Sequence, residues 1–421
     1  MKQFRIDWST VPEKQMSFDE INSFLDKHKL TRLRQSKENA YVKCFEDIRN
    51  KYFVVNDWPP YVIICGYSST LGFFKLTTHG NIQEVRDSGI DGGDAMEAIN
   101  NDFKRLYKKS MAAAFRTVKY GSTAKEIKVC VPSPINYATD FWKEQRLYDI
   151  QKADVSSAYP FELSKSVPTL EDHKRVLGRV EPNEEYPFAF YLKSQHIKII
   201  EEDGTVVSTF DLAKSKEYMV SNKKKYYDTL INKFNNIPAE EDITILCKRA
   251  AYSFKPIMEF YYNNRKDNPQ FKQYMNFTIG MFHNNKNPKY SHIAAVVLLR
   301  CSWNMVKRIN ELKKLNCEPL LANTDSIAWM GDDISLTTDK KTLGAFVLEH
   351  RNCEMIICSP KKYQWKDGDK VETTWAGVKG IKEMNLEYGK ILDPVINKKL
   401  LPVGYRWDDE KSRYIIGGVI I

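Results

Sequence analysis

The sequence predicts an α+β protein, because it mixes strand-like runs with helical stretches and shows no internal repeat over its 421 residues. Strand-like runs occur at residues 61–65, 71–77 and 243–247, as expected for short apolar segments bounded by turn-forming residues. Residues 292–315 instead have helical spacing, with one apolar stripe predicted to face a core. That stripe consists of Ile293, Val297, Cys301, Met305, Ile309 and Leu312.

The first 134 residues are predicted to form a separate α+β unit. Its first helix follows Ser17, which together with Glu20 matches a capping box. A loop at 89–94 then separates the first strand-like runs from a basic helix near 95–119. This loop lacks the spacing and the Lys-Ser/Thr pair of a phosphate-binding loop, so we interpret it as a turn.

A proline-rich connector at 131–134 leads into the rest of the chain. Further strands are predicted at 187–192 and 196–200, followed by a very basic segment at 214–225. A helical block is predicted at 256–280. Residues 320–322 and 327–330 then form two predicted strands of a hairpin that carries Asp325 at its tip.

The charge balance favours a polyanionic partner. Lys and Arg total 64 against 54 Asp and Glu, which gives a formal net charge of +10. Such an excess indicates nucleic acid before membrane, because neutralised phosphates release counterions. A basic surface without a partner explains the same numbers equally well.

The cysteine pattern predicts reduced, buried thiols. The eight cysteines are scattered, several of them in apolar runs, and none forms a Cys-x-x-Cys pair. The first residues do not resemble a signal peptide, and the longest apolar run, 293–299, is too short to span a bilayer. We therefore expect a soluble cytoplasmic protein that does not bind membranes.

Two remote aspartates are the main functional candidates. Asp154 and Asp325 each lie at the end of a short apolar strand, or in the turn after it. Two Mg²⁺ ions can clamp the attacking and leaving oxygens of nucleotidyl transfer, and Mg²⁺ prefers carboxylate, phosphate and water oxygens. Taken alone, Asp154 is better explained as a turn cap and Asp325 as an ordinary hairpin residue; their joint occurrence, with a basic helix between them, favours the metal site.

Other residues are suited to the same substrate. Tyr159 follows Asp154 closely, where its ring could pack under a sugar and exclude a 2′-hydroxyl; a core tyrosine before Pro160 is the simpler alternative. Lys272 and Asn276 are spaced to share one helix face. A solvated basic face is the alternative for that pair.

Five motifs in order resemble family B DNA polymerases, above all the protein-primed branch found in bacteriophages. Residues 154–160 match Asp-x-x-Ser-x-Tyr-Pro, and residues 272–280 keep Lys, Asn and Gly of Lys-x-x-x-Asn-Ser-x-Tyr-Gly. Residues 323–326 resemble Asp-Thr-Asp-Ser, residues 361–363 match Lys-x-Tyr, and residues 375–382 resemble the segment that leads into the thumb. The likeness covers roughly residues 135–421.

The resemblance implies a right-hand polymerase, with an antiparallel palm sheet, helical fingers and a small thumb, plus the N-terminal α+β domain. The implied domains are 1–134 (N-terminal), 135–254 (palm with an inserted subdomain), 255–290 (fingers), 291–383 (palm) and 384–421 (thumb). The insertion would occupy about 169–252, where the protein-primed branch contacts its priming protein. That branch's other insertion, between Gly280 and Asn323, is expected to be absent.

The resemblance also assigns roles to individual residues. Asp154 and Asp325 would be catalytic and would ligate two Mg²⁺, with Mn²⁺ as the alternative ion and the Val155 carbonyl as a further ligand. The incoming dNTP would be held by Ser157, Tyr159, Arg265, Lys266, Lys272 and Asn276. The primer terminus and DNA would be held by Thr324, Lys361, Tyr363 and Lys379.

Several positions depart from the family pattern. Asn323 replaces the first aspartate of the hairpin motif, which weakens the expected activity, while Asp325 keeps the firmer ligand. Phe277 and Ile279 replace Ser and Tyr, which affects contacts with the templating base. The N-terminal unit lacks an Asp-x-Glu exonuclease motif, since Asp7 is not followed by the second acid. No proofreading is therefore expected.

The sequence thus predicts an exonuclease-deficient, phage- or mobile-element-encoded DNA polymerase that acts in the bacterial cytoplasm on primer-template DNA and dNTPs. A priming protein or other replication proteins are further expected partners. The alternative is a catalytically weak or inactive DNA-binding replication or defence factor with the same fold. A primer-synthesising or terminal-transferase activity is a third reading, against which Tyr159 argues.

Overall fold

The computed structural model describes residues 11, 13–32, 51–56, 63–77, 92–215, 217, 219, 221–283, 288–332, 342–375, 385–393, 404–408 and 413–417. The chain forms two compact units: residues 1–89 with 371–421, and residues 90–370. The segment 92–134 therefore belongs to the larger unit, so the observed division at residue 89 differs from the predicted end of the N-terminal unit at 134. The other predicted domain bounds stay predictions.

The smaller unit contains a five-stranded sheet in the order β1-β5-β4-β3-β2, with helix α1 (Phe18–Lys27). Its strands are β1 (Glu13–Gln15), β2 (Thr31–Arg32), β3 (Lys51–Asn56), β4 (Ile63–Ser68) and β5 (Gly72–Thr77). The predicted capping box is confirmed: the Ser17 Oγ accepts from the Glu20 backbone N–H, and the Glu20 carboxylate accepts from that of Ser17. A short 3₁₀ turn (Lys390–Leu392) and the hairpin β18 (Gly404–Asp408) and β19 (Arg413–Gly417) belong to the same unit.

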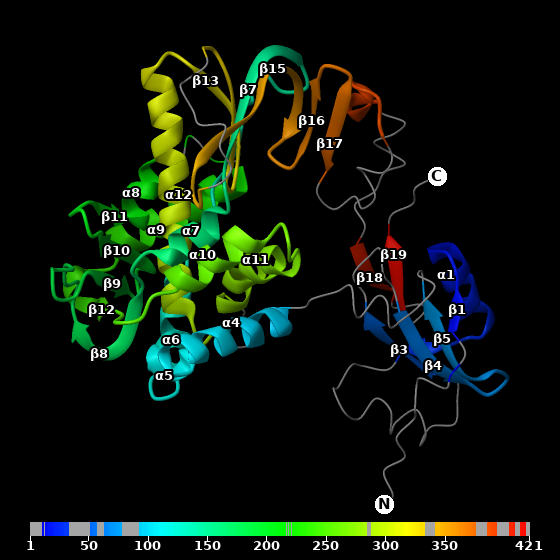
Figure 1. Cartoon of the computed structure of the whole chain (residues 1–421), viewed down its shortest axis with the longest axis horizontal. Helices are drawn as coiled ribbons and strands as arrows, with labels where there is room; N and C mark the ends of the chain where they lie inside the picture. Colours follow the sequence, from blue (N-terminus) through cyan, green and yellow to red (C-terminus); the bar gives the residue numbers. More distant parts are fainter. Residues whose placement is uncertain are drawn as a thin grey trace, which may run out of the picture. The chain divides into compact units, whose positions relative to one another are not determined.

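The larger unit is built around a seven-stranded sheet in the order β17-β16-β15-β7-β14-β13-β6 (Figure 1), of which the edge strand β17 begins at the last residue of that unit, Lys370. Its strands are β6 (Asn136–Ala138), β7 (Arg146–Val155), β13 (Glu318–Asn323), β14 (Ser326–Met330), β15 (Phe346–Ser359), β16 (Lys362–Asp367) and β17 (Lys370–Trp375). The pairings of β7 with both β14 and β15 are antiparallel. The central strand β7 therefore depends for all its sheet hydrogen bonds on segments far along the chain.

A second antiparallel sheet has the order β11-β10-β9-β12-β8. Its strands are β8 (Pro168–Leu177), β9 (Phe188–Tyr191), β10 (His196–Ile200), β11 (Val206–Ser208) and β12 (Ile243–Arg249), which confirms the three strands predicted in this region. The helices α8 (Thr209–Lys214) and α9 (Ser221–Asn236) and the 3₁₀ turn Ala239–Glu241 lie within the same stretch. These elements form what we call the five-stranded subdomain, with strands between residues 168 and 249. It fills the interval that the resemblance assigned to an insertion.

The remaining helices surround the long helix α12 (Ser291–Lys314), which confirms the helix predicted at 292–315. Figure 1 shows α12 running beside the seven-stranded sheet and on past α7 (Ala158–Ser164). All six residues of its predicted apolar stripe are buried. The other helices are α4 (Gly92–Tyr107), α5 (Met111–Ala114), α6 (Gly121–Ile127) with the 3₁₀ turn Lys128–Cys130, α10 (Lys255–Asn264) and α11 (Gln270–Phe282).

Three local predictions were wrong. The expected loop at 89–94 is partly helical, because α4 already begins at Gly92. The expected basic helix at 95–119 ends at Tyr107, and Lys108 follows with a left-handed φ of 55°. The expected helical block at 256–280 is two helices, α10 and α11. Pro269 explains that break, since the residue before a proline disfavours the helical conformation.

Packing of aromatic rings explains why residues 92–134 belong to the larger unit. Phe103 of α4 and Phe115 lie against Phe254, with ring centroids 5.5 and 5.2 Å apart, and Phe115 stacks on Phe254 at 10°. The same buried cluster contains Ile127 and most of the inner face of α12. Burying these rings, at roughly 25 cal/mol per Å² of apolar surface, fixes α4 to α6 onto the larger core.

The described cysteines are free and buried, as predicted; they are Cys65, Cys130, Cys247, Cys301, Cys317, Cys353 and Cys358. Cys44 lies outside the described residues. Among the helices that the structure describes, none has the length and apolar character required to cross a bilayer.

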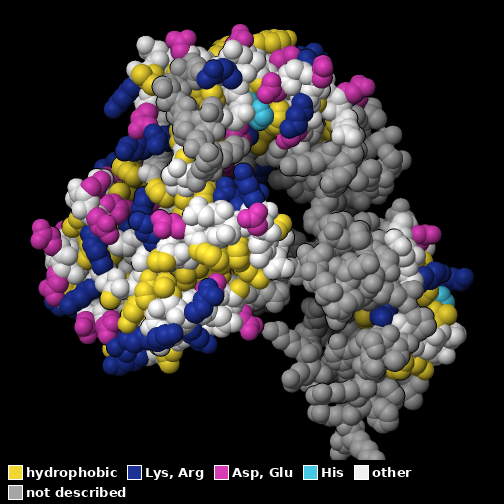
Figure 2. Space-filling view, viewed as in Figure 1, with side chains coloured by type: hydrophobic (Ala, Val, Ile, Leu, Met, Phe, Trp, Pro, Cys, Tyr) yellow, Lys and Arg dark blue, Asp and Glu magenta, His cyan; other side chains and the backbone are white. Residues whose placement is uncertain are grey.

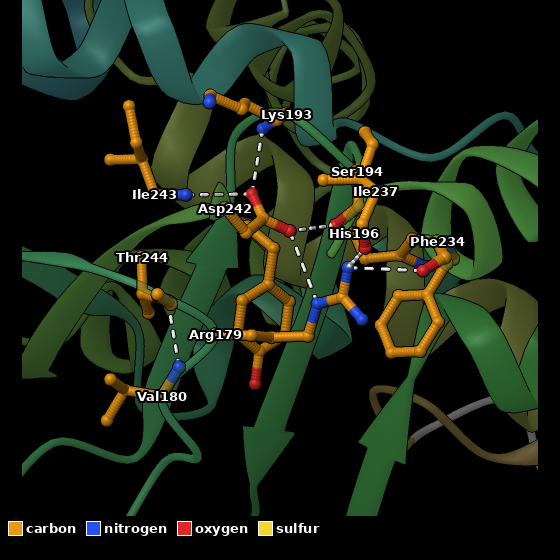
Figure 3. Close-up of polar contacts among 12 residues, drawn as sticks. Arg179, Val180, Lys193, Ser194, His196, Phe234, Ile237, Asp242, Ile243 and Thr244 are labelled. Carbon is orange, nitrogen blue, oxygen red and sulfur yellow. Dashed lines mark hydrogen bonds and ion pairs between the residues drawn. The ribbon is translucent and has the colours of Figure 1, made fainter. Parts of the chain in front are cut away.

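A buried polar network stabilises the five-stranded subdomain (Figure 3). The fully buried Asp242 carboxylate accepts hydrogen bonds from the Ser194 hydroxyl (2.6 Å) and from the backbone N–H groups of Lys193 (3.0 Å) and Ile243 (2.9 Å). Arg179 donates to the same carboxylate at 3.3 Å, and also to the carbonyls of Phe234 and Ile237 at 3.1 Å each. Both oxygens of the buried Asp242 carboxylate thus accept hydrogen bonds, as burial of a charged group demands.

Two buried histidines should make the fold sensitive to acid. Burial lowers the pKa of His196 to about 4 and that of His292 to about 3. Loss of hydration keeps His196 neutral, even though the hydrogen bond from its Nε2 to the Leu230 carbonyl (3.0 Å) opposes that effect; its Nδ1 lies 2.8 Å from the Thr209 hydroxyl. Protons therefore bind the unfolded chain first as the pH falls below about 6.5, which disfavours folding.

We expect His292→Leu to remove part of this acid sensitivity. Below pH 6.5 the unfolding free energy of the wild type should fall relative to that of the variant by about 1.4 kcal/mol per pH unit. Denaturant unfolding of both proteins at pH 7, 6 and 5 measures their unfolding free energies. Subtracting the value of the variant from that of the wild type removes the contribution of carboxyl groups that both proteins share. A difference that does not change with pH would contradict the assignment of a neutral His292.

Candidate active site

The two candidate acids come together at one end of the seven-stranded sheet. Asp154 is the penultimate residue of β7, and Asp325 lies in the two-residue turn between β13 and β14. Ser326 pairs with Asp154 in the register of the two strands, and the Val155 N–H donates to the Asp325 carbonyl at 2.8 Å. The backbones of both acids are thus fixed next to each other by the sheet itself.

The predicted hairpin is confirmed, and its turn is very tight. Asn323 pairs with Ser326, and the Asp325 N–H donates to the Asn323 carbonyl at 2.6 Å. Thr324 has a left-handed φ of 61°, which costs a β-branched residue conformational energy. Such strain is often retained at functional sites, and here it sets the position of Asp325.

The Asp325 carboxyl is in a poorly solvated environment. Burial raises its pKa to about 6, against the opposing effects of its own backbone N–H and the Lys152 ammonium; Glu349 adds to the increase. A carboxylate with so little hydration gains more than an exposed one from a nearby cation. Asp325 is therefore electrostatically suited to metal binding.

The beginning of α7 completes one wall of the site. Ser157 precedes this helix with a left-handed φ of 55°. Tyr159 is partly buried; burial and the nearby Cys301 and Asp325 raise the pKa of its phenol, which also hydrogen-bonds with Thr324. The tyrosine of the first motif and the turn of the second therefore touch. Sequence spacing alone did not predict that contact.

Ser156 connects this wall to helix α10. Its backbone exchanges 2.8 Å hydrogen bonds with residues 344 and 345, and its hydroxyl lies 2.5 Å from the hydroxyl of Tyr262. The guanidinium of Arg265 packs over the Tyr262 ring at 3.4 Å and donates to the Tyr262 carbonyl. Arg265 is therefore partly committed to a structural contact, whereas Lys266 is exposed.

Lys272 and Asn276 share an exposed face of α11, as their spacing predicted. The opposite face of that helix is buried through Met275, Ile279 and Phe282. Phe277, one of the departures from the family motif, is 41% exposed. The exposed face thus carries a cation, an amide and an aromatic ring that do not take part in the core.

The residues expected at the primer terminus differ in accessibility. Lys361 is exposed in the turn between β15 and β16. Tyr363 is only 6% exposed and packs in a core cluster with Met355 and Trp365, so Lys361 is the more accessible of the two. Lys379 lies outside the described residues, as does Asp7 of the exonuclease comparison.

Two residues at the site were not singled out from the sequence. Lys152 precedes Asp154 by two positions on β7, so both side chains lie on one face of the sheet. Its ammonium is 2.7 Å from a carboxylate oxygen of Glu349 on β15. The two-residue spacing could have identified Lys152, but no local signal connects it to Glu349.

The donor atoms fit Mg²⁺ or Mn²⁺ brought together with a substrate. Asp154 and Asp325 supply carboxylate oxygens and Asn323 lies beside them, and these are hard ligands. In the part of the chain that the structure describes, no group of three or more His, Cys, Asp or Glu residues could hold a metal ion. Such a sparse set is expected where phosphates and water complete the coordination.

A cavity of about 810 Å³ lies elsewhere in the larger unit. Its lining includes Phe161 and Lys165 at the far end of α7 and the buried Arg300, which makes a bidentate ion pair with Glu201 (2.7 Å each). Neither Asp154 nor Asp325 lines it. It is therefore a separate feature from the acidic site.

The fold is similar to solved structures of a DNA polymerase, whereas no family model and no curated protein matches the sequence. The structure of Phi29 DNA polymerase complexed with primer-template DNA aligns over 94% of this chain and 87% of that chain, with a TM-score of 0.55 and 14% identity. The complex of that polymerase with primer-template DNA and incoming nucleotides aligns over 89% and 88%, with a TM-score of 0.53 and 14% identity. This chain thus has a mixed helix and sheet fold, with antiparallel sheets, similar to that of Phi29 DNA polymerase.

Proposed function

We propose that this chain is a template-directed DNA polymerase that adds dNMPs to a primer 3′-hydroxyl, without proofreading. The observation that carries the proposal is the placement of Asp154 and Asp325 on hydrogen-bonded neighbouring strands at one end of the sheet. The fold similarity to a polymerase complexed with DNA and nucleotides supports it. We further propose that the protein acts in phage or mobile-element replication in a bacterial cytoplasm, where a priming protein is a further partner.

In this mechanism the protein mainly positions and neutralises its substrates. Divalent ions bound at this site would supply Lewis-acid activation of the 3′-hydroxyl and charge stabilisation at the leaving pyrophosphate. Asp154 and Asp325, with the Val155 carbonyl, would hold those ions, and Asn323 contributes a neutral oxygen where the family has a carboxylate. Tyr159 limits the space at the sugar and so favours deoxynucleotides.

The remaining contacts hold the nucleotide and the primer. Lys272 presents a point charge to the triphosphate from the exposed face of α11, and Lys266 and Arg265 assist it. Asn276 packs against the nascent base pair, and Ser157 contacts the nucleotide at the start of α7. Thr324 and Lys361 face the primer terminus, with Tyr363 and Lys379 as further DNA contacts.

Surface charge also supports a nucleic-acid substrate. Figure 2 shows Lys and Arg side chains gathered along the lower edge of the larger unit. In the segment from α4 to α6 the exposed cations are Lys104, Arg105, Lys108, Lys109, Arg116, Lys119 and Lys125. Some of these are neutralised locally, as Arg116 is by Glu171. The others can bind phosphates along a duplex.

Primer extension tests the proposal directly. We expect the wild-type protein to extend a labelled primer on a template with dNTPs in Mg²⁺, in the order that the template dictates, and to use ribonucleotides much less well. Extension should be lost without divalent ions. Salt-sensitive DNA binding with no dNTP turnover in Mg²⁺ or Mn²⁺ would refute the enzymatic proposal and favour a DNA-binding factor. Addition without a template would indicate a terminal transferase.

A further inference from the structure

A buried ion pair adjoins the two candidate metal ligands. The Lys152 ammonium lies 2.7 Å from Glu349 Oε2, and the two side chains are only 12% and 23% exposed. Lys152 shares a strand face with Asp154, and Glu349 follows the part of β15 that pairs with Ala153 and Asp154. An ion pair so little exposed is costly to build, since both charges lose hydration. Its position beside the acids therefore calls for a functional explanation.

The electrostatic coupling shows that the pair and the acids act on one another. Burial would lower the pKa of Lys152, but Glu349, Tyr363 and Asp154 outweigh that effect and raise it. Lys152 in turn opposes the increase in the pKa of Asp325, whereas Glu349 adds to it. The carboxyl groups of Glu349, Asp154 and Asp325 thus all lie within electrostatic range of the Lys152 ammonium. That cation remains charged at neutral pH.

We propose that Lys152 is a built-in counter-cation of the acidic site, and that Glu349 holds it beside the position of the divalent ions rather than in it. This inference rests on the proposed function for the identity of the metal site. Lys152 is a positioning residue here: it reduces the repulsion between the carboxylates before metal binds, and it competes electrostatically with the incoming ion. The pair therefore sets the divalent-ion concentration that the site requires.

The two members of the pair should have opposite effects on metal affinity. Removing Lys152 takes away a competing cation and leaves Glu349 to add negative charge, so affinity rises. Neutralising Glu349 releases Lys152 toward Asp154 and Asp325, so affinity falls. A unit charge about 4 Å away changes affinity by about fivefold in water-like surroundings and by much more at the lower effective dielectric constant of a protein site, so about tenfold is the smallest change we expect from each variant. A pair with a merely structural role would shift both variants in the same direction.

Mn²⁺ binding to the full-length protein, without DNA or nucleotide, provides the test. Electron paramagnetic resonance of free Mn²⁺ measures the dissociation constants of the wild type, Lys152→Met and Glu349→Gln. We expect at least about tenfold tighter binding for Lys152→Met and at least about tenfold weaker binding for Glu349→Gln. Lys152→Arg, which keeps the charge, should stay close to the wild type.

A second Lys–Glu pair on the same sheet supplies a matched control. Lys366 and Glu354 face each other across β15 and β16 at 2.7 Å, with 35% and 28% exposure. Lys366→Met and Glu354→Gln should leave Mn²⁺ affinity unchanged. If Lys152→Met does not fold, as judged by thermal unfolding in EDTA, Lys152→Gln takes its place with the same expected direction.

Shifts of the same sign in both variants, or shifts no larger than those of the control pair, would overturn the inference. Its failure is distinguishable from failure of the proposed function. A wild type that extends primers while both variants bind Mn²⁺ normally refutes only the role of Lys152. Opposite shifts in a protein that extends no primer leave the counter-cation in place and refute the polymerase.

Discussion

Asp325→Asn is expected to reduce dNMP incorporation by about a thousandfold or more, since metal ions contribute several kcal/mol to charge stabilisation and each 1.36 kcal/mol is tenfold in rate. Asparagine keeps the shape of the side chain and the hairpin turn but removes the charge that holds the ions. Asp154→Asn should have an effect of the same size, because both carboxylates would hold the same pair of divalent ions. Single-turnover primer extension in Mg²⁺ measures the loss.

Asp149→Asn is the matched control for this experiment. Asp149 lies on β7, the strand that also carries Asp154. It is exposed, and its left-handed φ of 55° is one that asparagine adopts readily. It should retain wild-type extension. Primer-template affinity of all three variants should be unchanged or slightly tighter, since each loses a negative charge. Incorporation by Asp325→Asn within tenfold of the wild type would contradict the proposed mechanism.

Asp242→Ala is expected to destabilise the protein by about 3–5 kcal/mol, because it removes one partner of a buried charge pair. The substitution leaves the Arg179 guanidinium, 12% exposed, without its carboxylate, and leaves two backbone N–H groups and the Ser194 hydroxyl without their acceptor. Burial alone would raise the pKa of Asp242, but these donors outweigh it and lower it, which shows how strongly they favour the charged form. Denaturant unfolding at pH 7 measures the change.

The ion pair between Lys198 of β10 and Glu181, which lies between β8 and β9 and is 64% exposed, provides the comparison in the same subdomain. Glu181→Ala should cost less than about 1 kcal/mol, as surface ion pairs do. A loss below 1 kcal/mol for Asp242→Ala would mean that water replaces the lost acceptor. The network would then not be what holds the five-stranded subdomain together.

Features with local signals were predictable from the sequence. The spacing of apolar residues identified α12, the capping box identified the start of α1, and the turn at Thr324 identified the hairpin that carries Asp325. Each depends on residues within a few positions of one another. The break between α10 and α11 also had a local signal, Pro269, which the apolar pattern on either side obscured.

Features that depend on remote contacts were not predictable. Phe115, the residue after α5, stacks on Phe254, the residue before α10, and this contact between remote segments places residues 92–134 in the larger unit. The pairing of Lys152 with Glu349 and the burial of Tyr363 likewise arise only when β7, β15 and β16 assemble. Hydrophobic periodicity shows which face of an element is buried, but it does not show what covers that face.

The position of β7 between β14 and β15 also constrains how this protein is made. While the ribosome has produced only the first 320 residues, neither neighbour of β7 exists, and the strand that carries Asp154 has two unpaired edges. Such edges are prone to aggregation until partners arrive. The five-stranded subdomain, whose strands all lie between 168 and 249, can form earlier. Biogenesis should thus pass through an intermediate in which this subdomain is native and the acidic site does not yet exist.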